Sequence, residues 1–549
     1  MFDREPRLPM LVPINSSDYH PANDRDVRVC RDQLTANLLP AFNFVRGSLE
    51  IAQHNQRTCY DKHRKGIHFE LGDLVMIATT EGSALGKWEA PKSDPRWKMK
   101  LLLTIVFSTL LLFLFDYSQS QTCSKTQECK NKACCSKYGN CGYGPDFCKK
   151  DQCLSNCQSK AECGKYGVKE KCPLNVCCSE FGFCGTTNDF CDKPKKKCQN
   201  NCGNKTLPKC SSSNEKNLIV LGYYASWAAY RTCQKFTPRN IDPRVYTHLN
   251  YAFGNISNGL LVNPSIKEEE ENIKDFVGLK KINTNLKVLI SVGGWLFNDP
   301  GPTRTEFHKL ALTQASRKRF ITSCMDFFKK YGFDGIDIDW EYPTAEDRGG
   351  SPEDSENYVK LVKEMRQVFG NNYLITIAAP ASYWYLRHFK IGEMSKSLDF
   401  INCMTYDIHG VWNEHIESLG PYVKSHTNIK EITEALQLFL RDGVNTNKLV
   451  LGLGYYGRSF QLETSSCSKV GCKFKEAAKE GRCTKAAGVL AWFEIQEIID
   501  TKGGVVKPIL DKDSMSKILT FDNDQWVAYD DEETLALRRK YAAENCLKG

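Results

Sequence analysis

Cysteine is distributed very unevenly along this chain of 549 residues, and this distribution constrains the fold more than any other feature. Sixteen of the 26 cysteines lie between Cys123 and Cys202, in a stretch with too few large aliphatic side chains to build a core. Such density is typical of small domains that disulfides hold together in an oxidising compartment. Zinc could use the same thiolates, but the stretch contains no histidine. We therefore expect disulfides and no metal.

The cysteines of this stretch also repeat. Five of them recur 43 positions later, and each half holds eight cysteines with one adjacent pair. The sequence therefore predicts two tandem modules, residues 121–158 and 159–203, each with four disulfides. The repeated positions are Cys129, Cys134, Cys135, Cys141 and Cys148, followed by Cys172, Cys177, Cys178, Cys184 and Cys191.

Residues 98–120, immediately before the modules, have the features of a signal peptide. Lys98 and Lys100 precede an apolar block, 101–115, and Ser118 and Ser120 provide a small-residue cleavage site. The block is about 15 residues long, whereas a membrane-spanning helix needs about 20. We expect a secreted protein, extracellular or in the cell wall, without stable membrane insertion. An uncleaved anchor or a buried helix is the alternative, because residues 1–97 precede the signal; they are either a genuine extension or a misassigned gene start.

The positive charge of the chain is concentrated in the modules. Residues 121–210 contain sixteen lysines and eight acidic residues, an excess of 8 against a net charge of +9 for the whole chain. The segment contains no arginine, the residue best suited to bidentate recognition of phosphates and bases. We therefore expect no nucleic-acid partner. Attraction to an anionic cell wall and simple solubility both remain open.

After a polar linker, 204–217, the pattern changes to short apolar runs that alternate with helical stretches. This alternation is typical of a parallel α/β fold, and seven such runs predict a (β/α)8 TIM barrel from residue 218 to 549. Functional side chains are then expected at the carboxyl ends of the strands. The residues that fall there are Tyr223, Trp295, Glu341, Met404, Tyr406, Asp407 and Arg458. The predicted strands are 218–224, 247–253, 288–292, 335–340, 374–378, 400–406 and 449–453, and a helix at 317–330 precedes the fourth.

The fourth predicted strand carries three carboxylates at alternate positions. Asp337, Asp339 and Glu341 therefore share one face of a strand that is otherwise apolar. Burying three like charges favours retention of a proton on one of them at neutral pH, which is what a general acid requires. Asp334 has the opposite parity, and we expect it to be structural. The strand therefore predicts an acid site.

The blocks 134–141 and 177–184 resemble the hevein-like chitin-binding module. This resemblance implies a sugar-binding face made of one serine and three aromatic residues, on which flat rings cover the apolar faces of a pyranose. The first module has Asn140 at one aromatic position, so we expect weaker binding there. The alternative is that these aromatics only fill small cores. The implied residues are Ser179, Phe181, Phe183 and Phe190 in the second module, and Ser136, Tyr138 and Phe147 in the first.

Four motifs, at 291–294, 334–341, 404–407 and 456–460, make the remainder similar to family 18 glycoside hydrolases of the chitinase type. The resemblance implies that Glu341 protonates the glycosidic oxygen, while the substrate's own acetamido group acts as nucleophile. It further implies that Asp339 orients that group, Asp337 shares a proton with Asp339, and Tyr406 holds the acetamido oxygen. No cofactor is implied. The residues expected to bind substrate are Tyr223, Trp295, Met404, Asp407, Trp412 and Arg458.

The same resemblance implies a small α+β insertion that includes 489–495 and 524–530, and a helix at 532–544 that leads into an eighth strand. We expect that strand to be missing, because few residues follow the helix. The sequence predicts a monomeric endochitinase whose partners are chitin and chito-oligosaccharides. Two alternatives remain: a chitin-binding lectin whose incomplete barrel is weakly active or inactive, and an enzyme that hydrolyses N-glycan cores.

Overall fold

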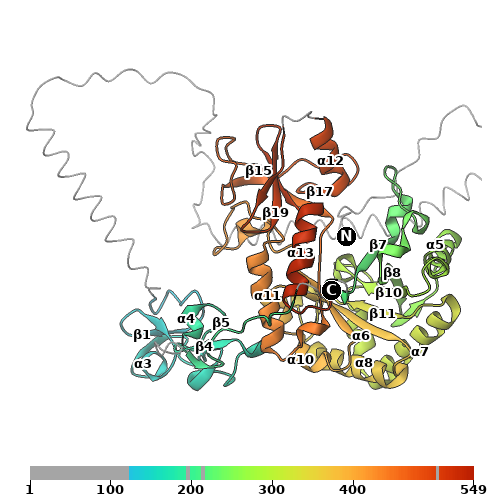
Figure 1. Ribbon diagram of the computed structural model, residues 1–549. Coiled ribbons are helices and arrows are strands. Elements are labelled where there is room, and N and C mark those ends of the chain that lie inside the picture. The colour runs from blue at the N-terminus through green and yellow to red at the C-terminus, as the bar shows by residue number, and fades with distance from the viewer. Residues whose placement is uncertain (1–122, 193–197, 212–214, 216, 502–505) are drawn as a thin grey trace, which may run out of the picture. The chain divides into compact units, whose positions relative to one another are not determined.

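The computed structural model describes residues 123–192, 198–211, 215, 217–501 and 506–549. They form two cysteine-rich modules, a parallel sheet surrounded by helices, and an antiparallel insertion (Figure 1). The predicted extension, 1–97, and signal peptide, 98–120, lie outside the described residues. Within the described part of the chain, no helix combines the length and apolarity needed to cross a membrane.

Each module is a three-stranded antiparallel sheet with one short helix. The order is β2-β1-β3 in the first module and β5-β4-β6 in the second, so the two repeats have the same topology. The bounds are Cys134–Ser136 (β1), Cys141–Gly142 (β2), Pro145–Cys148 (α3) and Cys153–Ser155 (β3), then Cys177–Ser179 (β4), Cys184–Gly185 (β5), Asn188–Cys191 (α4) and Cys198–Asn200 (β6).

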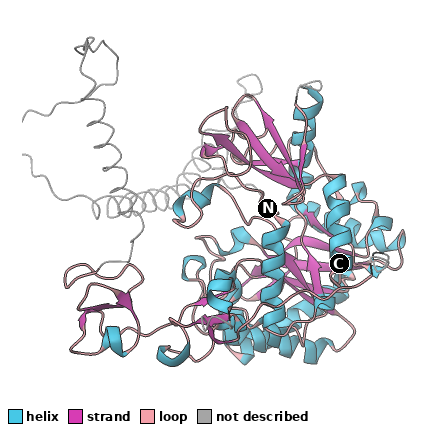
Figure 2. Cartoon of the chain, turned by 60° about the vertical axis from the view of Figure 1, so that its left-hand side comes forward, coloured by secondary structure: helices cyan, strands magenta, loops and turns pink. Residues whose placement is uncertain are grey.

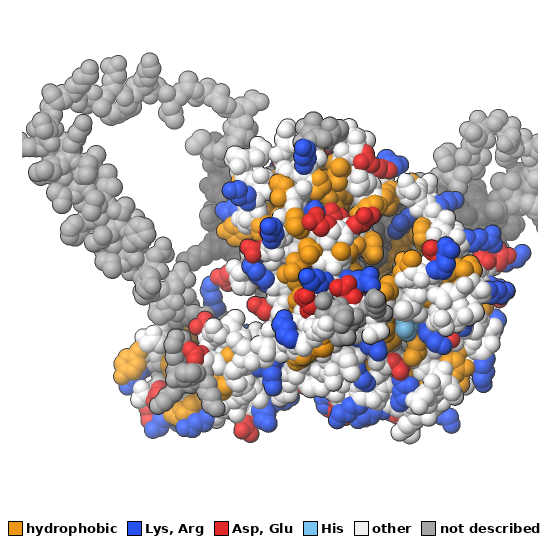
Figure 3. Space-filling model, viewed as in Figure 1, with side chains coloured by type: hydrophobic (Ala, Val, Ile, Leu, Met, Phe, Trp, Pro, Cys, Tyr) orange, Lys and Arg blue, Asp and Glu red, His pale blue; other side chains and the backbone are white. Residues whose placement is uncertain are grey.

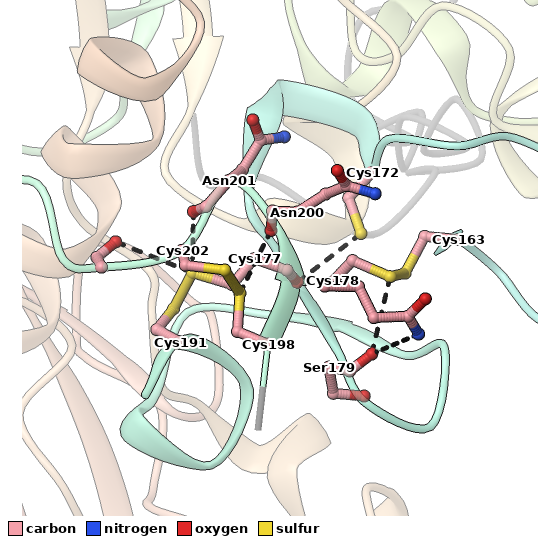
Figure 4. The surroundings of a disulfide bond; sticks show 12 residues. Cys163, Cys172, Cys177, Cys178, Ser179, Cys191, Cys198, Asn200, Asn201 and Cys202 are labelled. Atoms are coloured by element: carbon pink, nitrogen blue, oxygen red, sulfur yellow. Dashed lines mark hydrogen bonds between the residues drawn. A yellow bond between two sulfur atoms is a disulfide. The ribbon is translucent and has the colours of Figure 1, made fainter. Parts of the chain in front are cut away.

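The disulfide framework that the cysteine density predicts is confirmed. Each module has four disulfides, paired in the same order, and Figure 4 shows the pairs 163–178, 177–191 and 198–202 of the second module. The pairs are 123–135, 129–141, 134–148 and 153–157 in the first module, and 163–178, 172–184, 177–191 and 198–202 in the second.

Among the described residues, seven parallel strands form one curled sheet in the order β7-β8-β10-β11-β12-β13-β14, which confirms the predicted barrel with one strand fewer than eight. These strands are runs of apolar residues because both faces are covered. β8 continues past residue 253, where it pairs with β9 (Leu260–Val262). The bounds are Leu221–Ala225 (β7), His248–Ser257 (β8), Lys287–Gly293 (β10), Gly335–Asp339 (β11), Leu374–Pro380 (β12), Phe400–Met404 (β13) and Leu449–Leu451 (β14).

Helices cover the outer face of this sheet (Figure 2). The helix predicted at 317–330 is Gln314–Tyr331 (α7). It starts earlier because the Thr313 hydroxyl accepts a hydrogen bond from the Ser316 backbone, and it ends at Gly332, whose φ of 88° suits glycine. The other main helices are Lys267–Gly278 (α5), Glu306–Leu312 (α6), Asp354–Phe369 (α8), Tyr383–Leu386 (α9), Ile391–Met394 (α10), Ile429–Arg441 (α11) and Glu532–Glu544 (α13).

The two edges of the curled sheet, β7 and β14, are joined by residues that follow α13. The Lys548 backbone N–H donates to the Leu449 carbonyl, and the Lys548 carbonyl accepts from the Ile219 N–H. The Leu451 N–H donates to the Gly549 carbonyl. Residues 548–549 therefore fill the first part of the position that an eighth strand would take. No eighth strand is formed among the described residues.

The predicted insertion is a six-stranded antiparallel sheet with one helix, and Trp526 and Phe460 are fully buried in it. It begins at Tyr456, before the two segments that the resemblance places in it. Arg458 lies in its first strand, β15, and not at the end of a barrel strand, because the motif 456–460 pairs with β20 and β17. The bounds are Tyr456–Leu462 (β15), Phe474–Ala477 (β16), Val489–Ala491 (β17), Trp492–Thr501 (α12), Ile509–Asp511 (β18), Ser516–Phe521 (β19) and Gln525–Tyr529 (β20).

The charged side chains are mixed on the face of the molecule shown in Figure 3. Lysine and arginine lie among aspartate and glutamate over the barrel and the insertion. Four of the sixteen lysines of residues 121–210 lie outside the described residues: Lys193, Lys195, Lys196 and Lys197.

Candidate active site

The acidic strand lies in the interior of the curled sheet. Every residue of β11 is buried, and Asp337, Asp339 and Glu341 are 0%, 3% and 2% exposed. Ile336 and Ile338, which have the opposite parity, belong to the main hydrophobic core. Since Asp337 bonds to side chains from four other strands, this face of β11 points into the barrel. The three carboxyl groups are therefore together in a setting of low polarity.

Asp337 accepts four hydrogen bonds, each from a different strand. Its Oδ2 accepts from the Tyr223 hydroxyl of β7 at 2.8 Å and from the Ser291 hydroxyl of β10 at 2.7 Å. Its Oδ1 accepts from the Thr376 hydroxyl of β12 at 2.7 Å and from Asn402 Nδ2 of β13 at 3.0 Å. Hydrogen bonds to both oxygens favour the ionised form. Asp337 is thus the fixed centre of the acidic set.

Thr376 and Asn402 were not among the predicted site residues. Each is a polar side chain inside an otherwise apolar strand, β12 or β13, and each is buried. A buried polar group in such a strand requires a partner. That requirement was the signal in the sequence that could have identified them.

Asp337 and Asp339 differ in how readily they give up a proton. Burial raises the pKa of Asp337, and its four hydrogen-bond donors oppose this rise. Burial raises the pKa of Asp339 well above its usual value, and the charges of Glu341 and Asp337 raise it further. Asp339 Oδ1 has no hydrogen-bond partner among the described residues. The geometry therefore favours Asp339 as the carrier of a shared proton.

Asp407 and Arg458 form an ion pair beside this set. Asp407 follows β13 with a φ of 58°, and its carboxylate accepts from Arg458 Nε and from the Tyr456 hydroxyl, both at 2.7 Å. Burial acts to raise the pKa of Asp407, but the charge and the hydrogen bond of Arg458 hold that pKa well below its usual range. Asp407 is therefore a permanent anion at neutral pH.

His426 and Tyr406 complete this side of the site. His426 is fully buried, and its Nδ1 accepts a hydrogen bond from the Asp407 backbone N–H at 3.3 Å. His426 was not among the predicted residues, because the contact joins two distant loops. Burial and the Asp339 charge raise the pKa of Tyr406 well above its usual value. The Tyr406 hydroxyl is therefore a neutral donor at any physiological pH.

Two tryptophans lie in the loops that follow the strands. Trp295, in Trp295–Asn298 (η8) after β10, lies under the guanidinium of Arg348, 3.7 Å from the ring centroid. Trp412, in Val411–His415 (η10), lies under the guanidinium of Arg458 at 4.8 Å. Both indoles are only partly buried. Met404, at the end of β13, is 7% exposed in the main core, and its contact with sugar stays a prediction.

In the modules, the predicted binding residues divide into two groups. Tyr138 and Phe181 are 75% and 67% exposed. The serines are buried, and their hydroxyl oxygens accept hydrogen bonds from the backbone of Asn140 and Phe183.

Phe147 and Phe190 pack against a glycine of their own module. A Cβ atom built on Gly142 or Gly185 would lie 2.5 Å from the phenylalanine ring. The exposed rings of Tyr138 and Phe181 are thus free to contact a ligand, and the buried serine hydroxyls hold the turns that carry them.

Comparison with known families assigns this barrel. The profile of glycosyl hydrolases family 18 matches residues 219–549. The chain belongs to this family. A second profile, named chitin recognition protein, matches residues 162–202 of this family 18 protein, which is its second module.

Chitinases are among the proteins whose sequences are similar to this chain. The chain is 33% identical over 428 residues to the secreted chitinase LysM12 of Penicillium expansum, over 75% of this chain but 26% of that protein. It is 30% identical over 396 residues to chitinase A1 of Niallia circulans, over 60% of this chain and 55% of that protein.

Solved structures of chitinases are also similar. Catalytic domain 2 of the group II chitinase of Ostrinia furnacalis superposes with a TM-score of 0.54 at 29% identity, over 61% of this chain and 88% of that chain. The group IV chitinase of the same insect, solved with allosamidin, gives 0.54 at 31% identity, over 60% of this chain and 90% of that one.

Proposed function

We propose that this protein is a secreted chitinase that hydrolyses internal β-1,4 linkages between N-acetylglucosamine units. The observation that carries the proposal is the set of Asp337, Asp339 and Glu341 inside a family 18 barrel. Chitinases among the similar proteins, and a match to a chitin recognition module, support the choice of substrate.

In the proposed reaction, Glu341 protonates the glycosidic oxygen as the bond to the anomeric carbon breaks. The acetamido oxygen of the same sugar attacks that carbon and forms a cyclic oxazolinium ion, which water then opens with Glu341 as base. The anomeric configuration is retained. Because the nucleophile belongs to the substrate, the protein contributes mainly by holding reacting groups in position.

Asp339 and Tyr406 would orient the acetamido group. A protonated Asp339 still has a carbonyl oxygen that can accept from the acetamido N–H, and the neutral Tyr406 hydroxyl can donate to the acetamido oxygen. Asp337, held by four donors, would take the proton from Asp339 when positive charge develops on the oxazolinium ion. This transfer leaves one negative charge on the Asp337–Asp339 pair, and the negative charge left on Glu341 balances the positive charge of the oxazolinium ion.

The modules would hold the enzyme on insoluble chitin and so raise the effective concentration of the substrate. Phe181 and Tyr138 are the exposed rings available for stacking. We propose sugar binding by both modules, weaker in the first, where Asn140 takes the place of an aromatic ring.

The test is the release of soluble oligosaccharides from chitin by the full chain and by Glu341→Gln. We expect release to fall about 100-fold or more, because general acid catalysis contributes that much, while retention on chitin is unchanged. Glu346→Gln, in Glu346–Arg348 (η9) of the following loop, is the matched control. Equal release by wild type and Glu341→Gln would refute the assignment.

The seven-stranded sheet favours one alternative, a chitin-binding lectin. Residues 548–549 pair with the start of both sheet edges. In the described chain the remainder of each edge lacks an eighth strand, which weakens a barrel and exposes backbone groups. The lectin predicts retention on chitin with no release by wild type, so the same assay separates the two.

A further inference from the structure

Arg348 is a buried arginine that the proposed mechanism does not use. It ends the short helix η9 in the loop after the acidic strand, and it is 5% exposed. A buried guanidinium requires partners for its donors. Its partners come from two loops, the one after β11 and the one after β10.

The guanidinium of Arg348 makes four contacts. Nε donates to the backbone carbonyl of Glu341 at 3.1 Å, and Nη1 donates to Asp299 Oδ1 at 2.6 Å. Nη2 donates to the backbone carbonyl of Trp295. The plane of the group lies over the Trp295 indole, 3.7 Å from the ring centroid. The rigid guanidinium of Arg348 therefore connects the backbone of Glu341, the proposed acid, to Trp295.

These contacts have a geometric consequence for the indole. A planar guanidinium with donors in fixed directions allows little rotation once three of them are engaged. The guanidinium occupies one face of Trp295, so a sugar can stack only on the opposite face. The orientation and position of the opposite face of the Trp295 indole are then fixed relative to the backbone of Glu341.

We propose that Arg348 is a positioning residue that sets a sugar stacked on Trp295 in register with the carboxyl group of Glu341. This inference rests on the proposed function. Arg348 does not touch the reacting atoms. It acts through Trp295 and through the Glu341 backbone, and Asp299 compensates its charge.

The experiment measures kcat and KM on chito-oligosaccharides for Arg348→Lys, for Trp295→Ala and for the double variant. Lysine keeps the charge but cannot donate in three fixed directions or stack as a plane. We expect kcat/KM to fall about tenfold in Arg348→Lys, and the same change to have less than about a threefold effect when Trp295 is already alanine. Such non-additivity is the signature of residues that act together.

Arg304→Gln is the matched control. Arg304 Nη2 donates to the Glu346 and Asp347 carbonyls, so this guanidinium holds the same loop without bonding to Glu341 or to Trp295. We expect a smaller loss of kcat/KM that is independent of Trp295. Asp299→Asn, which weakens one of the four contacts at a half-buried position, gives a second variant in case Arg348→Lys does not fold. It should also lose activity only when Trp295 is present.

Two results would overturn the inference. One is wild-type activity in both Arg348→Lys and Asp299→Asn, and the other is a full additive loss in the Trp295→Ala background, which a purely structural role would give. Failure of the proposed function looks different. In that case Glu341→Gln would be as active as wild type, whatever Arg348 does.

Discussion

The cysteine-rich modules and the barrel present their functional side chains in opposite ways. In the modules, Tyr138 and Phe181 are mostly exposed, and disulfides hold the scaffold beneath them. In the barrel, Asp337 and Asp339 are buried, and side chains from several strands surround them. A residue on a covalent scaffold can be changed without loss of stability, whereas a residue in the core cannot. Function and stability should therefore separate in the modules and change together in the barrel.

The largest expected effect is that of Asp337→Asn. An amide has only one acceptor oxygen for the four donors, so at least one donor remains buried without a partner, at about 1–3 kcal/mol for each such group. We expect the melting temperature to fall and kcat to drop about 100-fold, as misplacement of neighbouring groups can produce. Calorimetry and a chito-oligosaccharide assay measure both. A variant that keeps its melting temperature but loses activity would contradict the prediction that function and stability change together in the barrel.

The next effect concerns acid stability. The pKa of Asp407 is lower in the folded protein than the ordinary value of about 3.9 in an unfolded chain. Its ionised form therefore stabilises the fold fully above about pH 4, the pKa of the unfolded chain. This stabilisation decreases as the pH falls below about 4 and is lost when the pH falls through the lower pKa of the folded protein. Asp407→Asn should be less stable than wild type to urea at pH 7, and this difference should shrink at pH 3. Asp513→Asn, at an exposed ion pair, should show no such difference at either pH.

A smaller effect is expected from Phe181→Ala in the second module. Loss of one stacking ring should weaken retention on insoluble chitin about tenfold, which corresponds to about 1.4 kcal/mol. Hydrolysis of soluble oligosaccharides and the melting temperature should not change. Val168→Ala, the control, shortens an exposed side chain of the same module that is not among the predicted binding residues. Equal losses in both variants would contradict the assigned binding face.

The smallest effect is a gain in the first module. Asn140 contributes backbone hydrogen bonds to Ser136, while its side chain is exposed. Asn140→Phe should therefore preserve the turn. It should strengthen binding of the soluble trimer of N-acetylglucosamine by about two- to fivefold, since one aromatic contact is added. Titration of the full chain measures this, with Asn140→Ala as the control. No gain would mean that the first module differs from the second in more than this ring.

Much of the fold could be predicted from local patterns. Apolar runs located the seven strands, and the spacing of Cys134 and Cys177 in the repeat located the modules, because both signals are short in sequence. The alternation of Asp337 and Asp339 placed them on one face, since strand parity is a local property. The order of the strands in the sheet follows from the barrel prediction, because consecutive strands of a (β/α)8 barrel lie side by side.

The rest depends on contacts between residues far apart in the chain. The pairing of Asp337 with Thr376 and Asn402 depends on the register of three neighbouring strands. His426 meets Asp407 only because two loops fold together. Arg458 was expected at the end of a barrel strand, but antiparallel pairing placed it in the insertion. Each of these contacts is set by tertiary structure, to which local sequence patterns are insensitive.

The most direct test of the proposed chemistry is the configuration of the first product. Chitohexaose is mixed with the full chain, and the anomeric proton of the newly formed reducing end is followed by NMR before mutarotation. If the acetamido group of the substrate attacks while Glu341 donates the proton, the β-anomer appears first. Initial formation of the α-anomer would mean direct attack by water and would contradict the proposed roles of Glu341, Asp339 and Tyr406.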